Sequence, residues 1–185
     1  SNKVPALFNI LANPDYEKVL IFCKTKYGAD IIVKALEEAS ITAASLHSGK
    51  TQAVREEALQ NFKDSNLRVL VATDVAARGI DVDNITLVIN YNLPEDPRNY
   101  IHRIGRTARA GKSGMAISFA VENDIRQLTI IENSIGQVIP VVTEQPFHKE
   151  FSKAPIQVKK KKPVTKTNRT RKKIKRNKNR YKLAN

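Results

Sequence analysis

A series of short apolar runs, rich in β-branched residues and separated by amphipathic stretches, is the feature that most constrains the fold. Polarity does not alternate along these runs, so each strand should be buried on both faces, which is typical of a parallel sheet. The predicted strands are residues 19–23, 43–46, 69–72, 87–91 and 115–120. The predicted helices are residues 27–39, 52–62, 99–103 and 124–135. The sequence therefore predicts an α/β fold with a parallel sheet, helices on both faces and right-handed crossovers.

In such a sheet, ligands bind beyond the carboxyl ends of the strands. Polar or turn-forming residues follow four predicted strands, at Thr25, residues 47–49, residues 73–74 and residues 91–94. These loops are predicted to line one rim. The sequence contains no Gly-x-x-x-x-Gly-Lys-Ser/Thr loop, so the domain by itself should not cradle a triphosphate in that way. The three histidines are too far apart in sequence to indicate a metal site, and we predict none.

The net charge of +14 is concentrated at the end of the chain. Residues 1–148 hold 16 Lys and Arg against 17 Asp and Glu, whereas residues 149–185 hold 16 Lys and Arg against Glu150 alone. A segment this basic and poor in apolar residues cannot build a core and should bind phosphate backbones with little sequence preference. We therefore predict a domain at residues 3–145 and a largely disordered basic tail at residues 146–185. A solubilising or localising role for the tail remains open.

The composition also bears on whether the protein is membrane-bound, disulfide-bonded or secreted. The apolar runs are only a few residues long, far short of the ~20 that a membrane span requires. The single cysteine, Cys23, excludes an internal disulfide framework, and no charged-then-apolar signal segment opens the chain. We therefore expect a cytoplasmic protein without a membrane partner.

Three arginines, Arg103, Arg106 and Arg109, recur at intervals of three residues. On a helix or tight turn they would share one face. Residues 102–111 contain no acidic side chain, so the anions that pair with these arginines are expected to come from elsewhere. Guanidinium groups bind phosphate oxygens bidentately and can stabilise charge that develops in phosphoryl transfer. The pattern favours a polyphosphate ligand over a merely basic helix.

Two longer segments resemble a known family. Residues 71–81, Val-Ala-Thr-Asp-Val-Ala-Ala-Arg-Gly-Ile-Asp, and residues 100–111, Tyr-Ile-His-Arg-Ile-Gly-Arg-Thr-Ala-Arg-Ala-Gly, resemble motifs V and VI of DEAD-box RNA helicases. Residues 20–25 resemble motif IV, and Gln52 with Arg55 matches the Gln-x-x-Arg block. The resemblance covers about residues 4–134 and is to the second RecA-like domain only, with similarity to the bacterial RhlE-like branch. The first domain, with its phosphate loop and acidic box, is absent from this sequence.

The resemblance implies that ATP lies between two RecA-like domains, with Mg²⁺ held mainly by the N-terminal domain of the same protein. It implies that Arg109 is the arginine finger, that Arg106 also reaches the phosphates, and that His102 couples the site to the acidic box of the other domain. Asp81 would bind the ribose, and Gly79 would let the backbone approach the nucleotide because it lacks a Cβ. The isolated domain should be inactive.

For RNA, the resemblance implies that consecutive phosphates of one strand are held without reading the bases. The contacts are expected from Thr25, Arg55, Thr73 and the backbone of Ser48 and Gly49. The family usually has glycine at the position of Ser48, although a serine amide can still donate.

Several alternatives stay open. Thr25 and Thr73 could simply cap helices, Asp81 could form a turn, and Gln52 could brace a loop. The leading function is an ATP-dependent RNA helicase. The alternatives are a non-catalytic RNA-binding or annealing module and a DNA translocase of the same superfamily, whose members commonly carry Gln where this chain has His102.

Overall fold

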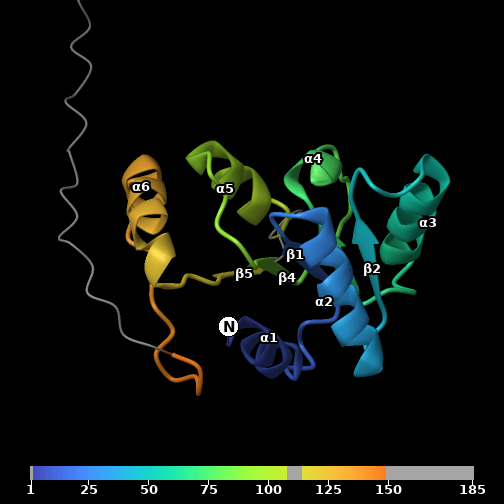
Figure 1. Cartoon of the computed structure of the whole chain (residues 1–185), viewed down its shortest axis with the longest axis horizontal. Helices are drawn as coiled ribbons and strands as arrows, with labels where there is room; N and C mark the ends of the chain where they lie inside the picture. Colours follow the sequence, from blue (N-terminus) through green and yellow to red (C-terminus); the bar gives the residue numbers. More distant parts are fainter. Residues whose placement is uncertain (1, 108–113, 149–185) are drawn as a thin grey trace, which may run out of the picture.

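The computed structural model describes residues 2–107 and 114–148. In this part of the chain, five parallel strands form one sheet in the order β2-β3-β1-β4-β5 (Figure 1). The strands are β1 (Val19–Phe22), β2 (Ala43–Leu46), β3 (Val69–Ala72), β4 (Leu87–Asn90) and β5 (Met115–Ser118). The predicted parallel sheet is confirmed, and three of the strands end one or two residues earlier than the apolar pattern suggested.

Helices cover both faces of the sheet, which explains why the strands are apolar throughout. Alternate residues of a strand point to opposite faces. In β1, Val19 and Ile21 pack in one cluster with residues of α1 (Lys3–Leu11) and α2 (Lys26–Glu38). Leu20 and Phe22 pack in a second cluster with residues of α3 (Gln52–Lys63) and α4 (Asp74–Ala77). The RecA-like arrangement expected from the sequence is thus present.

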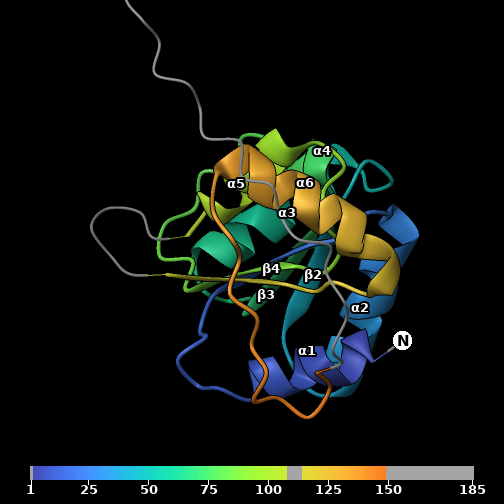
Figure 2. The same cartoon turned by 90° about the vertical axis from the view of Figure 1, so that its left-hand side faces the viewer.

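A smaller apolar cluster joins α5 (Pro97–Ile104) to α6 (Ile125–Ile135), which follows a 3₁₀ turn at Glu122–Asp124. Figures 1 and 2 both show these two helices next to each other. The predicted end of α6 is confirmed: Gly136 adopts a left-handed conformation with φ of 71°, which glycine tolerates without a steric penalty.

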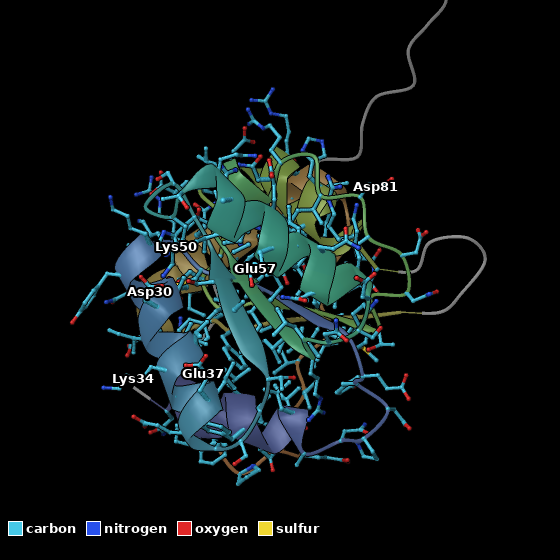
Figure 3. All side chains as sticks on the ribbon, turned by 90° about the vertical axis from the view of Figure 1, so that its right-hand side faces the viewer. Asp30, Lys34, Glu37, Lys50, Glu57 and Asp81 are labelled. Carbon is cyan, nitrogen blue, oxygen red and sulfur yellow. The ribbon has the colours of Figure 1, made fainter. Side chains whose placement is uncertain are left out.

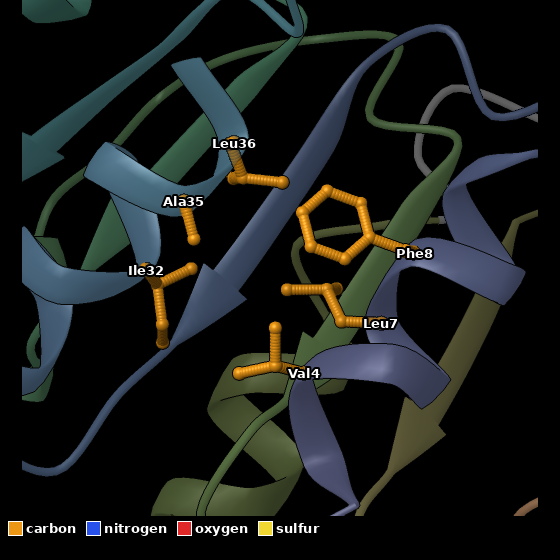
Figure 4. A pocket seen from close by; sticks show the side chains of 6 residues that line it. All are labelled: Val4, Leu7, Phe8, Ile32, Ala35 and Leu36. Atoms are coloured by element: carbon orange, nitrogen blue, oxygen red, sulfur yellow. The ribbon is translucent and has the colours of Figure 1, made fainter. Parts of the chain in front are cut away.

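None of the predicted helices corresponds to α1 or α4. Helix α1 packs on α2, with Val4, Leu7 and Phe8 facing Ile32, Ala35 and Leu36 across a small apolar notch (Figure 4). The far end of α1 is held by Arg68, whose guanidinium donates to the carbonyl oxygens of Leu11 at 2.7 Å and Tyr16 at 3.0 Å. This contact joins residues more than 50 positions apart, so no local pattern could indicate it.

Strand order decides which loops become neighbours. The loops after β2, β3 and β1 follow adjacent strands, although other elements separate them in the sequence. In Figure 1, α4 and α5 lie at the end of the sheet to which the arrow of β2 points. No helix in residues 2–107 or 114–148 is long and apolar enough to cross a membrane.

Candidate functional site

The predicted RNA-binding residues lie on one rim of the sheet. Ser48 and Gly49 follow β2, Thr73 follows β3, and Thr25 follows shortly after β1. Neighbouring strands are about 4.8 Å apart, so the three loops span roughly 10 Å along the rim. Arg55 lies in the first turn of α3, the helix that follows the loop after β2.

Thr25 caps α2, as one of the alternatives proposed. Its hydroxyl oxygen accepts a hydrogen bond from the backbone N–H of Gly28 at 3.0 Å. The cap uses the hydroxyl only as an acceptor, so its O–H can still donate to an external anion. Gly28 was not singled out from the sequence. A Cβ at this position would lie 2.9 Å from both Thr25 Oγ1 and Cys23 Sγ, so glycine is needed to keep the cap in place.

Thr73 also occupies an N-cap position, at the start of α4, but its side chain makes no capping hydrogen bond. The half-buried hydroxyl is therefore not used by the helix that it precedes. Helix capping therefore accounts for part of the role of Thr25 but for none of the role of the Thr73 side chain.

A buried histidine shapes the loop after β2. The Nε2–H of His47 donates to Asp30 Oδ1 at 3.0 Å, and its Nδ1 accepts from the backbone N–H of Gly49 at 3.1 Å. Nδ1 therefore carries no proton. The Gly49 amide, predicted to contact a phosphate, is already engaged inside the loop, so an external phosphate would compete with His47 for it. No hydrogen bond of the described residues engages the neighbouring amide of Ser48, which is exposed.

Asp30 is the anionic centre of this cluster. Burial raises the pKa of its carboxyl group, but hydrogen bonds from His47, Ser45 and Lys50 outweigh that effect and hold the pKa well below its usual range. Ser45 Oγ donates to Asp30 Oδ1 at 2.6 Å, and Lys50 Nζ lies 3.1 Å from the same oxygen. Figure 3 shows Asp30 and Lys50 together, well separated from Asp81.

Arg55 is oriented by its own helix. Its Nη1 donates to Gln52 Oε1 at 3.2 Å, and Gln52 Nε2 donates in turn to Glu56 Oε1 at 2.7 Å. The Nε of Arg55 is buried and has no hydrogen-bond partner in the described part of the chain. Gln52 thus braces the arginine through Nη1.

The spacing of the three arginines favoured a polyphosphate ligand, but Arg103 has its anion within the chain. This side chain is only 3% exposed and forms a bidentate pair with Asp74, with Nε–Oδ1 at 2.6 Å and Nη2–Oδ2 at 2.7 Å. Its Nη1 donates to Asn90 Oδ1 and to the Asn92 carbonyl, and the guanidinium lies 4.9 Å from the centre of the Phe22 ring. Residue spacing could not reveal an anion supplied by another segment.

Arg106 follows the end of α5, and its Nη1 donates to the carbonyl oxygen of Ile80 at 2.7 Å. This bond places Arg106 beside the predicted nucleotide residues Gly79 and Asp81. Gly79 has φ of +86°, a conformation that other residues rarely adopt, and a Cβ there would meet nothing within 4 Å. Glycine is therefore required by the backbone, and the space beside it is open. His102 is exposed in the last turn of α5, and Arg109 lies outside the described residues.

The fold and site match one class of protein. Residues 2–111 match the helicase conserved C-terminal domain, so the chain belongs to that family. The DEAD-box protein SrmB of E. coli, solved bound to regulator of ribonuclease activity A, aligns with a TM-score of 0.75 and 34% identity, covering 82% of this chain and 91% of that one. A DEAD box protein from Methanococcus jannaschii aligns with a TM-score of 0.69 and 40% identity, covering 74% of this chain and 37% of that one.

Curated sequences agree. The ATP-dependent RNA helicase DBP8 of Meyerozyma guilliermondii is 44% identical over 75% of this chain and 32% of the relative. RhlB of Pseudomonas syringae, also an ATP-dependent RNA helicase, is 43% identical over 77% of this chain and 36% of the relative. The chain thus spans about a third of these relatives' length. Within its family it is the C-terminal domain of a DEAD-box helicase.

The Arg103 network predicts a stability effect. We expect Arg103→Met to lower the free energy of unfolding by about 2–3 kcal/mol, because it leaves Asp74 and the buried Asn90 without their donor. Urea denaturation measures the loss. Arg98→Met is the matched control, since it breaks an exposed Arg–Asp pair on the same helix and should change stability little. Equal losses in the two variants would contradict a structural role for Arg103.

The lowered pKa of Asp30 predicts a pH effect with a definite sign. The folded-state pKa lies below the unfolded value of about 3.9, so the carboxylate stabilises the fold above that pH and this contribution is lost as pH falls below it. The difference in unfolding free energy between wild type and Asp30→Asn should shrink as pH falls below about 4. Denaturation at a series of pH values measures it, with exposed Asp15→Asn as the control. A difference independent of pH below 4 would rule the effect out.

Proposed function

We propose that this chain is the C-terminal half of an ATP-dependent RNA helicase and that it binds one RNA strand along the rim formed after β2, β3 and β1. The observation that carries the proposal is the adjacency of these three loops, which bear Ser48, Gly49, Thr73 and Thr25. The names of the relatives DBP8 and RhlB support RNA and ATP as the ligands.

The available donors suit a phosphate backbone. The O–H of Thr25 lies at the N-terminus of α2, where helix N–H groups also favour an anion. Ser48 is exposed on the loop after β2, and its amide makes no hydrogen bond among the described residues, while Arg55 on α3 adds a cation beside that loop. Such donors recognise phosphate oxygens and carry no base information, so binding should tolerate any sequence.

The nucleotide would bind on the other side of α4 and α5. In this proposal Asp81 binds the ribose beside Gly79, Arg106 and Arg109 reach the phosphates, and His102 contacts the acidic box of the N-terminal RecA-like domain. The bond from Arg106 to Ile80 keeps the arginine beside the ribose loop. Mg²⁺ would be held mainly by the N-terminal domain. Among the described residues, no group of three or more His, Cys, Asp and Glu side chains could hold a metal ion.

The Arg103 network gives a physical route for coupling the two ligands. Asp74 follows Thr73 in the RNA rim, and Arg103 lies one turn before Arg106 in the nucleotide site. The Arg103–Asp74 pair therefore links the two proposed sites. If RNA and ATP both favour closure of the two RecA-like domains, each raises the affinity for the other by the same factor. Closure would bend one RNA strand and open a short duplex, and ATP hydrolysis would reset the enzyme. The cytoplasm is the proposed location of this activity.

The arginine-finger assignment predicts loss of turnover. In the longer protein, made by joining this chain to the domain that its gene encodes upstream, Arg109→Ala should lower RNA-stimulated ATP hydrolysis by roughly 10³- to 10⁵-fold. The exposed Arg126→Ala on α6 is the control and should retain activity. Retained turnover in Arg109→Ala would overturn the assignment. If the joined wild-type protein binds RNA but never hydrolyses ATP, the chain is a non-catalytic RNA-binding module.

The RNA assignment predicts a change in salt dependence. Each phosphate contact adds about 0.7–1 to the slope of log affinity against log salt concentration. Arg55→Ala should flatten the slope for single-stranded RNA by about that amount, and deletion of the proposed RNA-binding tail, residues 149–185, should flatten it by several times more. Fluorescence anisotropy of a labelled oligonucleotide measures both. An unchanged slope in Arg55→Ala, matching Arg126→Ala, would remove Arg55 from the RNA site.

A further inference from the structure

An exposed aromatic ring borders the proposed RNA rim and has no role in the contacts described so far. Tyr27, the second residue of α2, is 75% exposed, and it is the one large aromatic residue exposed in residues 2–107 and 114–148. It lies two positions after Thr25, the cap proposed to hold a phosphate. Covering a solvent-exposed tyrosine ring with a flat apolar partner lowers the free energy of the system.

The first turn of α2 lies against the neighbouring loop of the rim. A Cβ on Gly49 would be 3.4 Å from Cδ of Lys26, so the stem of Lys26 borders the loop after β2. Tyr27 is therefore on the same turn as one proposed phosphate contact, Thr25, and next to a second. An RNA strand that follows these contacts would pass the ring.

The surroundings of Tyr27 indicate what could cover it. Ile31, one turn further along α2, is 47% exposed, and the next turns carry the ion pair Lys34–Glu38. On α2 the exposed large apolar side chains are thus these two, and their area alone is far below that of a stable protein interface. A nucleobase is flat and of similar size to the ring, and the neighbouring cation Lys26 suits the phosphates on either side of such a base.

We propose that Tyr27 is a stacking platform for one base of the bound RNA, the base of the nucleotide whose phosphate is held at Thr25. The inference rests on the proposed function and adds a contact to a base face where that function predicts backbone contacts alone. Stacking uses the π-face that all four bases share, so it raises affinity without selecting a sequence.

Two substitutions test the stacking separately from charge. Tyr27→Ala in the full chain should weaken binding of a single-stranded RNA oligonucleotide by about 5- to 100-fold, whereas Tyr27→Phe keeps the ring and should bind within about twofold of wild type. Inorganic polyphosphate carries the charge without bases, so its affinity should be the same for both variants. Equal RNA affinity of the Ala and Phe variants would overturn the proposal.

A spectroscopic arm reports on the ring itself. The chain contains no tryptophan, so Tyr27→Trp introduces a single, selectively excited tryptophan whose emission RNA should quench and polyphosphate should not. Met115→Trp, on the half-exposed edge strand β5, is the matched control and should stay unquenched. Equal quenching by polyphosphate, or none by RNA, would contradict stacking.

Arg55→Ala, measured in parallel, separates failure of the stacking platform from failure of the proposed RNA rim. If Arg55→Ala weakens RNA binding and Tyr27→Ala does not, the RNA rim stands and the stacking platform fails. If neither variant changes RNA binding, the proposed rim itself fails.

Discussion

A buried guanidinium must be neutralised and hydrogen-bonded, and in this domain that requirement connects the functional segments. Arg103 meets it with Asp74 at the start of α4 and with Asn90 and Asn92 at the end of β4. Its planar face lies over Phe22 at the end of β1. Lysine could not form the same fork. A single side chain therefore holds the ends of two central strands and the starts or ends of two short helices in one arrangement.

This arrangement separates two kinds of loop. The loops after β2, β3 and β1 carry hydroxyl and amide donors, helix α3 adds the guanidinium of Arg55, and together they border the proposed RNA path. The segment after α4 and the residue after α5 meet through Arg106 and Ile80, beside a glycine whose backbone conformation leaves open space. Because Arg103 on α5 pairs with Asp74 on α4, a shift of one helix against the other would stretch this ion pair.

Internal hydrogen bonds decide which donors remain for a ligand. His47 takes the Gly49 amide and is itself held by Asp30, so the loop after β2 is organised before any ligand arrives. The hydroxyl oxygen of Thr25 accepts a hydrogen bond from the Gly28 N–H, and its own O–H can still donate to a ligand. Sequence motifs identify these residues. They do not show which donors are free and which already have a hydrogen-bond partner within the domain.

The sequence by itself determined the parallel sheet, most element positions and the candidate residues, because continuous apolar runs and helical periodicity are local signals. It also identified Gly79 and the end of the last helix at residue 135, although the positive φ of Gly79 became visible only in the structure. Tertiary structure alone decided the strand order, helix α1 with its Arg68 contacts, and the pairing of Arg103 with Asp74 across 29 positions. These depend on which distant groups meet when the chain closes its core, and an unpaired charge in the sequence carries no mark of its eventual partner.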